Sequence, residues 1–136
     1  MFGKLQNKPK NRIDSLIGSE LKIDGNISFS SGLRVDGEVN GNIIAAPGQS
    51  SMLVLSEHGR VNGEISVSHL VVNGTVDGPV RAAEYLELQG KAKVTGNVHY
   101  KTLEIHLGAV VEGRLIHLTD AASEKVVAFK LSSGGD

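Results

Sequence analysis

The chain has 136 residues, a formal net charge of −1, no cysteine, 17 glycines and only 4% aromatic residues. The balanced charge gives no indication of a nucleic-acid partner, and the lack of cysteine excludes disulfides and thiolate metal sites. Abundant glycine with few aromatics argues against a helical bundle and favours short strands. No apolar run approaches the roughly 20 residues of a membrane span or resembles a signal peptide, so we expect one domain with two short tails.

Residues 1–18 are predicted to form a flexible basic arm, because four basic residues precede the first acidic one, Asp14. One interpretation is a disordered, solubilising tail. The sharper one is contact with an anionic membrane surface, where apolar side chains insert shallowly and each basic side chain adds about 1 kcal/mol. Many such arms on one assembly would bind well together although each binds weakly. The predicted membrane-contact residues are Met1, Phe2, Lys4, Leu5, Lys8, Lys10 and Arg12.

Residues 19–118 repeat one pattern, whose clearest copy is Leu70–Val80. Apolar residues alternate with polar ones there, so Leu70, Val72, Val76 and Val80 are expected to point inward. Copies of the pattern begin at leucines 33, 53, 70, 86 and 103, intervals of 20, 17, 16 and 17 residues. The long first interval contains a loop insertion at 47–51. One copy cannot bury its apolar face alone, so the copies are expected to stack as a solenoid.

A period of about 17 residues predicts a coil of three strands of four or five residues joined by tight bends. Each strand would pair in parallel with its equivalent one coil away. The predicted fold is therefore an all-β, single-domain, triangular parallel β-helix of about six coils. Glycine is suited to the bends because it has no side chain to clash at positive φ. The predicted turn glycines are Gly37, Gly41, Gly63, Gly74, Gly78, Gly96 and Gly113.

Residues 119–136 depart from the repeat as a C-terminal end segment with a flexible tail. An apolar run after Lys125 is interpreted both as a strand or turn that covers the last coil and as a contact with another subunit. Large aromatic residues often dominate small interfaces, so Phe129 is the best single marker of that contact. The predicted polymerisation interface is Phe129, Val126, Val127 and Leu131.

The sequence offers no catalytic, cofactor-binding or metal site. No phosphate-binding loop, Gly-x-Ser-x-Gly motif or cysteine nucleophile is present, and the five histidines lack the spacing typical of zinc ligands. His99 and His117 lie about one coil apart, a spacing that would allow them to stack outward on neighbouring rungs but that alone makes no site. We therefore expect a protein that is not an enzyme and needs no cofactor.

The pattern at Leu33–Ile43, the coil that begins at Leu70, the Ile17-Gly18 entry and the short basic Met-Phe start together resemble the bactofilins. The resemblance covers residues 17–118 and, in character, the basic arm. It implies a right-handed β-helix that polymerises without nucleotide into non-polar filaments. It also implies a bacterial cytoskeletal scaffold on the cytoplasmic face of the inner membrane, with cell-wall or morphogenesis proteins as partners.

Physical reasoning predicts self-assembly independently. The end coils of a solenoid carry unpaired strand edges, which recruit further strands unless a cap covers them. No amphipathic helix is evident at either end of the sequence to serve as a cap. If like ends meet by two-fold contacts, the resulting filament has no polarity.

Two alternative functions remain open from the sequence. A hexapeptide-type β-helix acyltransferase would show a strict six-residue repeat and a histidine in a cleft between subunits, whereas the glycines here recur at irregular intervals. A monomeric β-solenoid binding module would carry a flat ladder of identical side chains, which the sequence lacks. Electron microscopy separates the three hypotheses, since they predict filaments, trimers and monomers.

Overall fold

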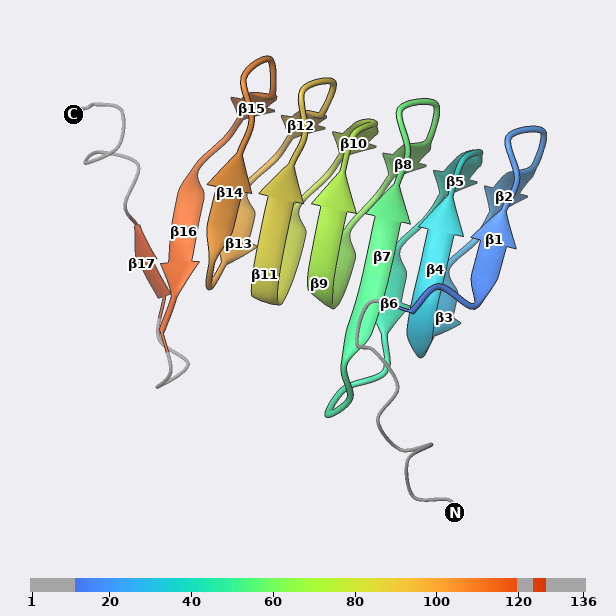
Figure 1. Cartoon of the computed structure of the whole chain (residues 1–136), viewed down its shortest axis with the longest axis horizontal. Helices are drawn as coiled ribbons and strands as arrows, with labels where there is room; N and C mark the ends of the chain where they lie inside the picture. The colour runs from blue at the N-terminus through green and yellow to red at the C-terminus, as the bar shows by residue number, and fades with distance from the viewer. Residues whose placement is uncertain (1–11, 120–123, 127–136) are drawn as a thin grey trace.

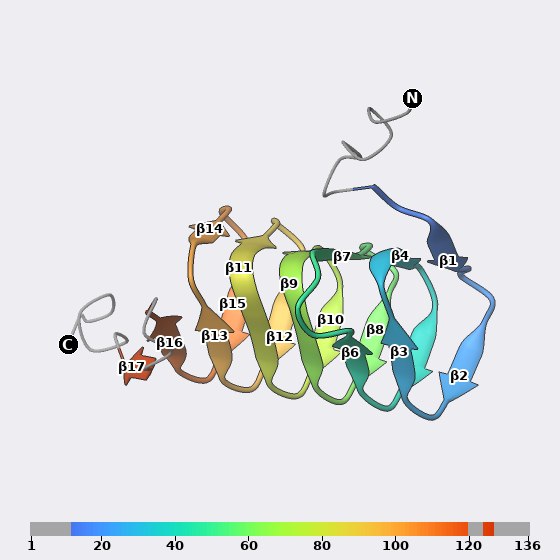
Figure 2. The same ribbon diagram turned by 90° about the horizontal axis from the view of Figure 1, so that it is seen from below.

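The computed structural model describes residues 12–119 and, for the backbone alone, 124–126. These residues form strands that wind around one long axis as a solenoid of stacked coils (Figure 1). A view turned by 90° shows the coils following one another along that axis (Figure 2). Successive coils pair through parallel strands in two sheets, and one of these sheets has six strands, one from each coil. The predicted all-β parallel solenoid of about six coils is thus confirmed.

Each coil contributes one strand to each of three faces. The first face holds β1 (Ser15–Ile17), β4 (Ser31–Val35), β7 (Ser51–Leu55), the second half of β9 (Ile65–Val72), the second half of β11 (Val80–Leu88) and β14 (Leu103–Ile105). The second face holds β2 (Lys22–Asp24), β5 (Glu38–Asn40), β8 (Arg60–Asn62), β10 (Thr75–Asp77), β12 (Lys93–Thr95) and β15 (Val110–Glu112). The third face holds β3 (Ile27–Phe29), β6 (Ile43–Ala45), the first halves of β9 and β11, β13 (Val98–Tyr100) and β16 (Leu115–Leu118).

Most strands have three residues, shorter than the four or five that the period predicted. The difference arises at the corners, where the chain turns between faces and the residues form bends instead of pairing with a neighbouring strand. Among the described strands, only β9 and β11 continue from the third face to the first as one strand, and the register of their pairing shifts between Ala82 and Tyr85.

Apolar side chains of equivalent strands stack in columns inside the solenoid. The leading leucines that defined the repeat are direct partners, from Leu33 through Leu53, Leu70 and Leu86 to Leu103. The inward residues predicted from the clearest copy are fully or almost fully buried: Leu70, Val72, Val76 and Val80. This alternation buries apolar surface, and each Å² removed from water contributes roughly 25 cal/mol of free energy. The interior is therefore the main source of stability.

Glycines form a second column at the corner between the second and third faces. A Cβ on Gly78, whose φ is +154°, would overlap the carbonyl oxygen of Gly63 one coil below. The corner therefore needs glycine both for its backbone conformation and for the close approach of successive coils. The same overlap with the preceding coil recurs along this column at Gly41, Gly63, Gly96 and Gly113.

The ends of the described chain extend the solenoid beyond the predicted repeat. β1 pairs with β4 and belongs to the first coil, although residues 15–17 were assigned to the basic arm. At the other end, β17 (Glu124–Val126) pairs antiparallel with β16. Within the described ranges, no helix is long and apolar enough to cross a membrane.

Candidate assembly surfaces

The N-terminal end of the solenoid leaves apolar residues uncovered. Leu16 and Leu21 in the first coil are 60% and 53% exposed, and Ile13 just before it is 39% exposed. The inward residues Ile23 and Ile27 are only partly buried, because no coil lies beyond them among the described residues. Within residues 12–119, the strands β1, β2 and β3 each pair with a strand on one side only. This end therefore presents an apolar surface bordered by three open strand edges.

Among the described residues, the C-terminal end is uncovered on two of its three faces. Ile105 is 47% exposed, Leu107 is 98% exposed and Val110 is 43% exposed. Ile105 is the last residue of an inward column. One coil earlier this column is fully buried, since Leu88, the partner of Ile105, has no exposed surface. Within the described chain, β14 pairs only with β11, and β15 pairs only with β12.

The third face of this end is closed by β17. Its backbone pairs antiparallel with β16, with Ile116 opposite Val126. Ile116 and Leu118 point away from the core cluster, yet they are only 8% and 6% exposed. An antiparallel strand here satisfies the edge of β16 and blocks a further coil from pairing on this face. A terminal strand covering the last coil is one of the two roles expected for this segment.

The predicted site residues fall unevenly within the described residues. Of the predicted polymerisation interface, only the backbone of Val126 is described, and Phe129, Val127 and Leu131 lie outside the described residues. Of the predicted membrane-contact residues, only Arg12 is described, and its Nε lies 2.8 Å from Asp14 Oδ1. The other members of that set lie outside the described residues: Met1, Phe2, Lys4, Leu5, Lys8 and Lys10. The predicted turn glycines lie at corners, with Gly37 and Gly74 between the first and second faces.

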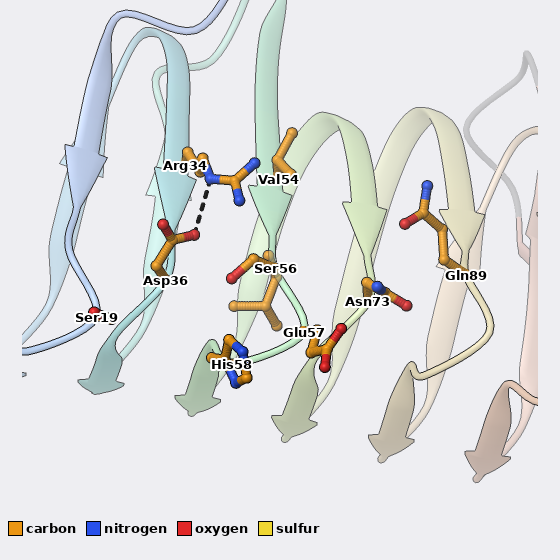
Figure 3. Close-up of a pocket in the computed structure, with 10 residues that line it drawn as sticks. Ser19, Arg34, Asp36, Val54, Ser56, Glu57, His58, Asn73 and Gln89 are labelled. Atoms are coloured by element: carbon orange, nitrogen blue, oxygen red, sulfur yellow. Dashed lines mark hydrogen bonds and ion pairs between the residues drawn. The ribbon is translucent and has the colours of Figure 1, made fainter.

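An open groove runs along the corner between the first and second faces (Figure 3). Its volume is about 440 Å³, and its lining includes Asp36, Glu57 and His58. Arg34 also lines the groove, but its Nε lies 2.9 Å from Asp36 Oδ1. The groove thus pairs its guanidinium with its own carboxylate, and a polar channel of this composition has little to offer an apolar ligand.

A serine pair closes the corner beside the inserted loop at 47–51. Ser51 is 1% exposed, and its backbone N–H donates to Ser68 Oγ at 2.7 Å. Ser68 Oγ in turn donates to the carbonyl oxygen of Ser51 at 2.8 Å and lies 3.0 Å from Nδ1 of His69. Because the hydroxyl of Ser68 satisfies backbone groups of the neighbouring coil, this serine and histidine hold the corner and do not form a nucleophile with its base.

A cluster on the first face joins the last two coils. Glu87 and Glu104 are direct partners in β11 and β14, and His106 follows β14. His106 Nε2 lies 3.0 Å from Glu87 Oε2 and 3.2 Å from Glu104 Oε2. The hydroxyl of Tyr85 donates to Glu104 Oε1 at 2.7 Å, and this hydrogen bond, with partial burial and the two carboxylates, raises the pKa of Tyr85 to about 12.

Sequence reasoning missed this cluster because it searched for histidines near one another along the chain. The signal was available in the period, since Glu87 and Glu104 are 17 residues apart, which is one coil. His99 and His117 are not partners in the register of these coils. In the structure His99 pairs with Ile116, and His117 pairs with Tyr100, because this pair of coils is in register at a spacing of 17 and not 18 residues.

Comparison with known proteins places these surfaces in context. Residues 15–116 match the bactofilin family, described as polymer-forming cytoskeletal. Over 102 residues, the chain is 26% identical to bactofilin BacP and 28% identical to bactofilin BacO, both of Myxococcus xanthus. Those residues are 75% of this chain; they span 41% of BacP and 78% of BacO, so the match covers about two fifths of the longer relative. No solved structure gives a significant match. Since the family match covers the six coils almost from end to end, the chain belongs to the bactofilins, a family of polymer-forming cytoskeletal proteins.

Proposed function

We propose that this bactofilin polymerises end to end, through its first and last coils, into non-polar filaments that need no nucleotide. The observation that carries the proposal is the opening of the apolar core at both ends. On the second face, Val61 and Val76 in the middle coils have no exposed surface, whereas Ile23 and Val111 at the two ends of the same column are partly exposed. Stacking a further coil on either end would bury these side chains and pair the open strand edges.

Like ends fit one another better than unlike ends. A head-to-tail stack would place three open strand edges of the first coil against a last coil whose third face is already paired with β17. Contact between two N-terminal ends matches three open edges with three, and contact between two C-terminal ends matches two with two. Such two-fold contacts alternate along the filament and give it no overall direction.

Nucleotide independence rests on the sequence and on the composition of the groove. The sequence lacks the Gly-rich loop and lysine that hold nucleotide phosphates. In the groove of Figure 3, the guanidinium of Arg34 is already engaged by the carboxylate of Asp36, which leaves it less available to a phosphate. Assembly is therefore expected in plain buffer, without hydrolysis.

We further propose that the filament lies on the cytoplasmic face of the inner membrane through its basic N-terminal arms. The support is the charge of residues 1–12, together with Phe2 and Leu5 as apolar groups that insert shallowly. A filament repeats the arm at every subunit, so weak single contacts add to firm binding. There the polymer would serve as a scaffold for proteins that build the cell wall or set cell shape.

Charged substitutions at the two ends test the assembly proposal. Leu107→Asp and Leu21→Asp each place a carboxylate at an exposed apolar position of an end coil, where it would face its own copy across a two-fold contact. Each single variant should stop at small oligomers joined through the unchanged end, and the double variant should be a monomer. The matched control is Ile44→Asp, which alters an exposed apolar residue on the third face in the second coil and not in an end coil.

The size of the assemblies is measured by electron microscopy and analytical ultracentrifugation in buffer without nucleotide. Filaments in the double variant would contradict the end-to-end contact, and filaments that form only after addition of ATP or GTP would contradict nucleotide independence.

Sedimentation with anionic liposomes tests the arm, since deleting residues 1–11 should release the filaments from lipid while leaving them intact. A deletion that still sediments with lipid would move the membrane contact elsewhere.

A further inference from the structure

We propose that Glu87, Glu104 and His106 form a binding site for one divalent transition-metal ion, of which Zn²⁺ is the representative probe. The three side chains converge from two adjacent coils of the first face, and their ligand atoms all lie within 4.8 Å of one another. The proposal concerns side chains near the C-terminal end and does not depend on how the filament assembles.

The distances suit a tetrahedral ion. Two ligand atoms held about 2.0–2.2 Å from Zn²⁺ at the tetrahedral angle are roughly 3.3–3.6 Å apart. His106 Nε2 lies 3.0 Å from Glu87 Oε2 and 3.2 Å from Glu104 Oε2. These two separations are within a few tenths of an ångström of the tetrahedral value, and the carboxylate oxygens of Glu87 and Glu104 lie within 4.8 Å of each other. Closing of the two carboxylates around the ion would complete three ligands, with water at the exposed side.

The charges of the cluster favour a divalent cation. Glu87 and Glu104 are direct partners on adjacent strands, and like charges in such a position destabilise a sheet. The imidazole of His106 reaches both carboxylate oxygens through the single nitrogen Nε2. An ion bound through both carboxylates and the imidazole would neutralise the pair, while the histidine ligand favours Zn²⁺, Co²⁺ or Ni²⁺ over Mg²⁺ and Ca²⁺.

Two outer partners orient the ligands. The hydroxyl of Tyr85 donates to Oε1 of Glu104 at 2.7 Å and lies 3.5 Å from Oε1 of Glu87, which leaves the Oε2 atoms directed toward His106. The side-chain amide of Gln89 donates to Glu87 Oε2 at 3.2 Å, and that oxygen retains a second lone pair. Hydrogen-bonded ligands of this kind are typical of metal sites in proteins.

Isothermal titration of the tag-free full chain with ZnCl₂ near neutral pH tests the proposal. We expect one ion per chain, no binding of Mg²⁺, and intense visible absorption when Co²⁺ replaces Zn²⁺. His106→Ala and Glu104→Gln should weaken binding by more than the roughly 10- to 100-fold that loss of an outer partner causes, and Tyr85→Phe should weaken it by about tenfold. These side chains are at the surface, and circular dichroism checks that the variants fold.

The matched control is His58→Ala, which removes an exposed histidine outside the cluster and should leave binding unchanged. Failure of the wild-type chain to bind Zn²⁺ would overturn the proposal. So would binding that persists at full strength in both His106→Ala and Glu104→Gln, since it would place the ion at other residues.

Discussion

The two ends of the solenoid differ although they finish the same repeat. At the N-terminal end, three strands have open edges in the part of the chain that the structure describes, and the inward Ile17 is only 7% exposed. At the C-terminal end, the equivalent Ile105 is 47% exposed, but β17 closes the edge of the third face. One end therefore offers more edges with a better-covered core, and the other offers fewer edges with a more open core.

This difference indicates that the two contacts of one polymer can depend to different extents on backbone pairing and on apolar burial. An open strand edge directs a partner into register, whereas an exposed apolar side chain adds affinity with little direction. The N-terminal contact is thus expected to depend more on strand pairing and the C-terminal contact more on side chains such as Leu107. The predictions below test how far the ends differ from the middle and from each other.

The largest effect is expected from a charge in the middle of the column that Ile105 ends. Val72→Asp places a carboxylate at a position with no exposed surface, and burial of such a group without a partner costs several kcal/mol. Since proteins of this size are stable by about 5–15 kcal/mol, we expect loss of the folded protein. Ile105→Asp, in the same column at the open end, should fold and lose only assembly. Circular dichroism during thermal unfolding distinguishes the two, and equal stability of both variants would contradict the distinction between end and middle.

A smaller difference is expected in the glycine column. Gly78→Ala and Gly25→Ala both place a side chain at positive φ, which costs roughly 1–3 kcal/mol. Only at Gly78 would the new Cβ also overlap the coil below, because nothing lies within 4 Å of a Cβ on Gly25 in the first coil. Gly78→Ala should therefore lower the midpoint of chemical unfolding more than Gly25→Ala. An equal loss would mean that strain alone determines the cost.

The sequence predicts the middle of this molecule better than its ends. A repeat read from leucines and valines identifies which residues stack, and the partners Leu53, Leu70 and Leu86 are in the predicted register. The partners of outward side chains can be predicted only when the spacing of each pair of coils is known. A spacing of 17 residues places His117 opposite Tyr100, whereas a spacing of 18 would place it opposite His99. The partners of Glu104 lie one coil away or just beyond its own strand, so no local motif marks that cluster.

Removal of residues 120–136 tests what β17 contributes to the C-terminal end. Its loss would open the edge of β16, the strand that carries Ile116 and Leu118 outside the core cluster. We expect thicker or laterally associated filaments, because an open apolar edge recruits further chains. Electron microscopy measures filament width, with the Leu118→Ser variant of the truncated chain as a control that should reduce the association. Truncated filaments of unchanged width would indicate that β17 has no role in protecting this edge.

The smallest effect concerns Tyr100, which lies one coil before the C-terminal end. Its ring is 8% exposed and is covered by His117 of the last coil, with ring centroids 5.6 Å apart. Burial disfavours the charged phenolate and raises the pKa of Tyr100 above 10.0. Because the pKa is higher in the folded chain than in the unfolded one, the stabilising contribution of the neutral tyrosine is fully present below pH 10.0 and is lost as the pH rises through the folded pKa.

Absorbance of the phenolate against pH in a Tyr85→Phe background measures this shift, since Tyr100 is then the remaining tyrosine of the two. We expect the transition above the ordinary value in that background, and His117→Ala should move it down by uncovering the ring. If the last coil were frayed as a whole, Tyr100 would already titrate with an ordinary pKa and His117→Ala would change nothing. That outcome would show that the C-terminal end is open one coil deeper than the burial of Tyr100 indicates, and it would shift the assembly contact inward to β13.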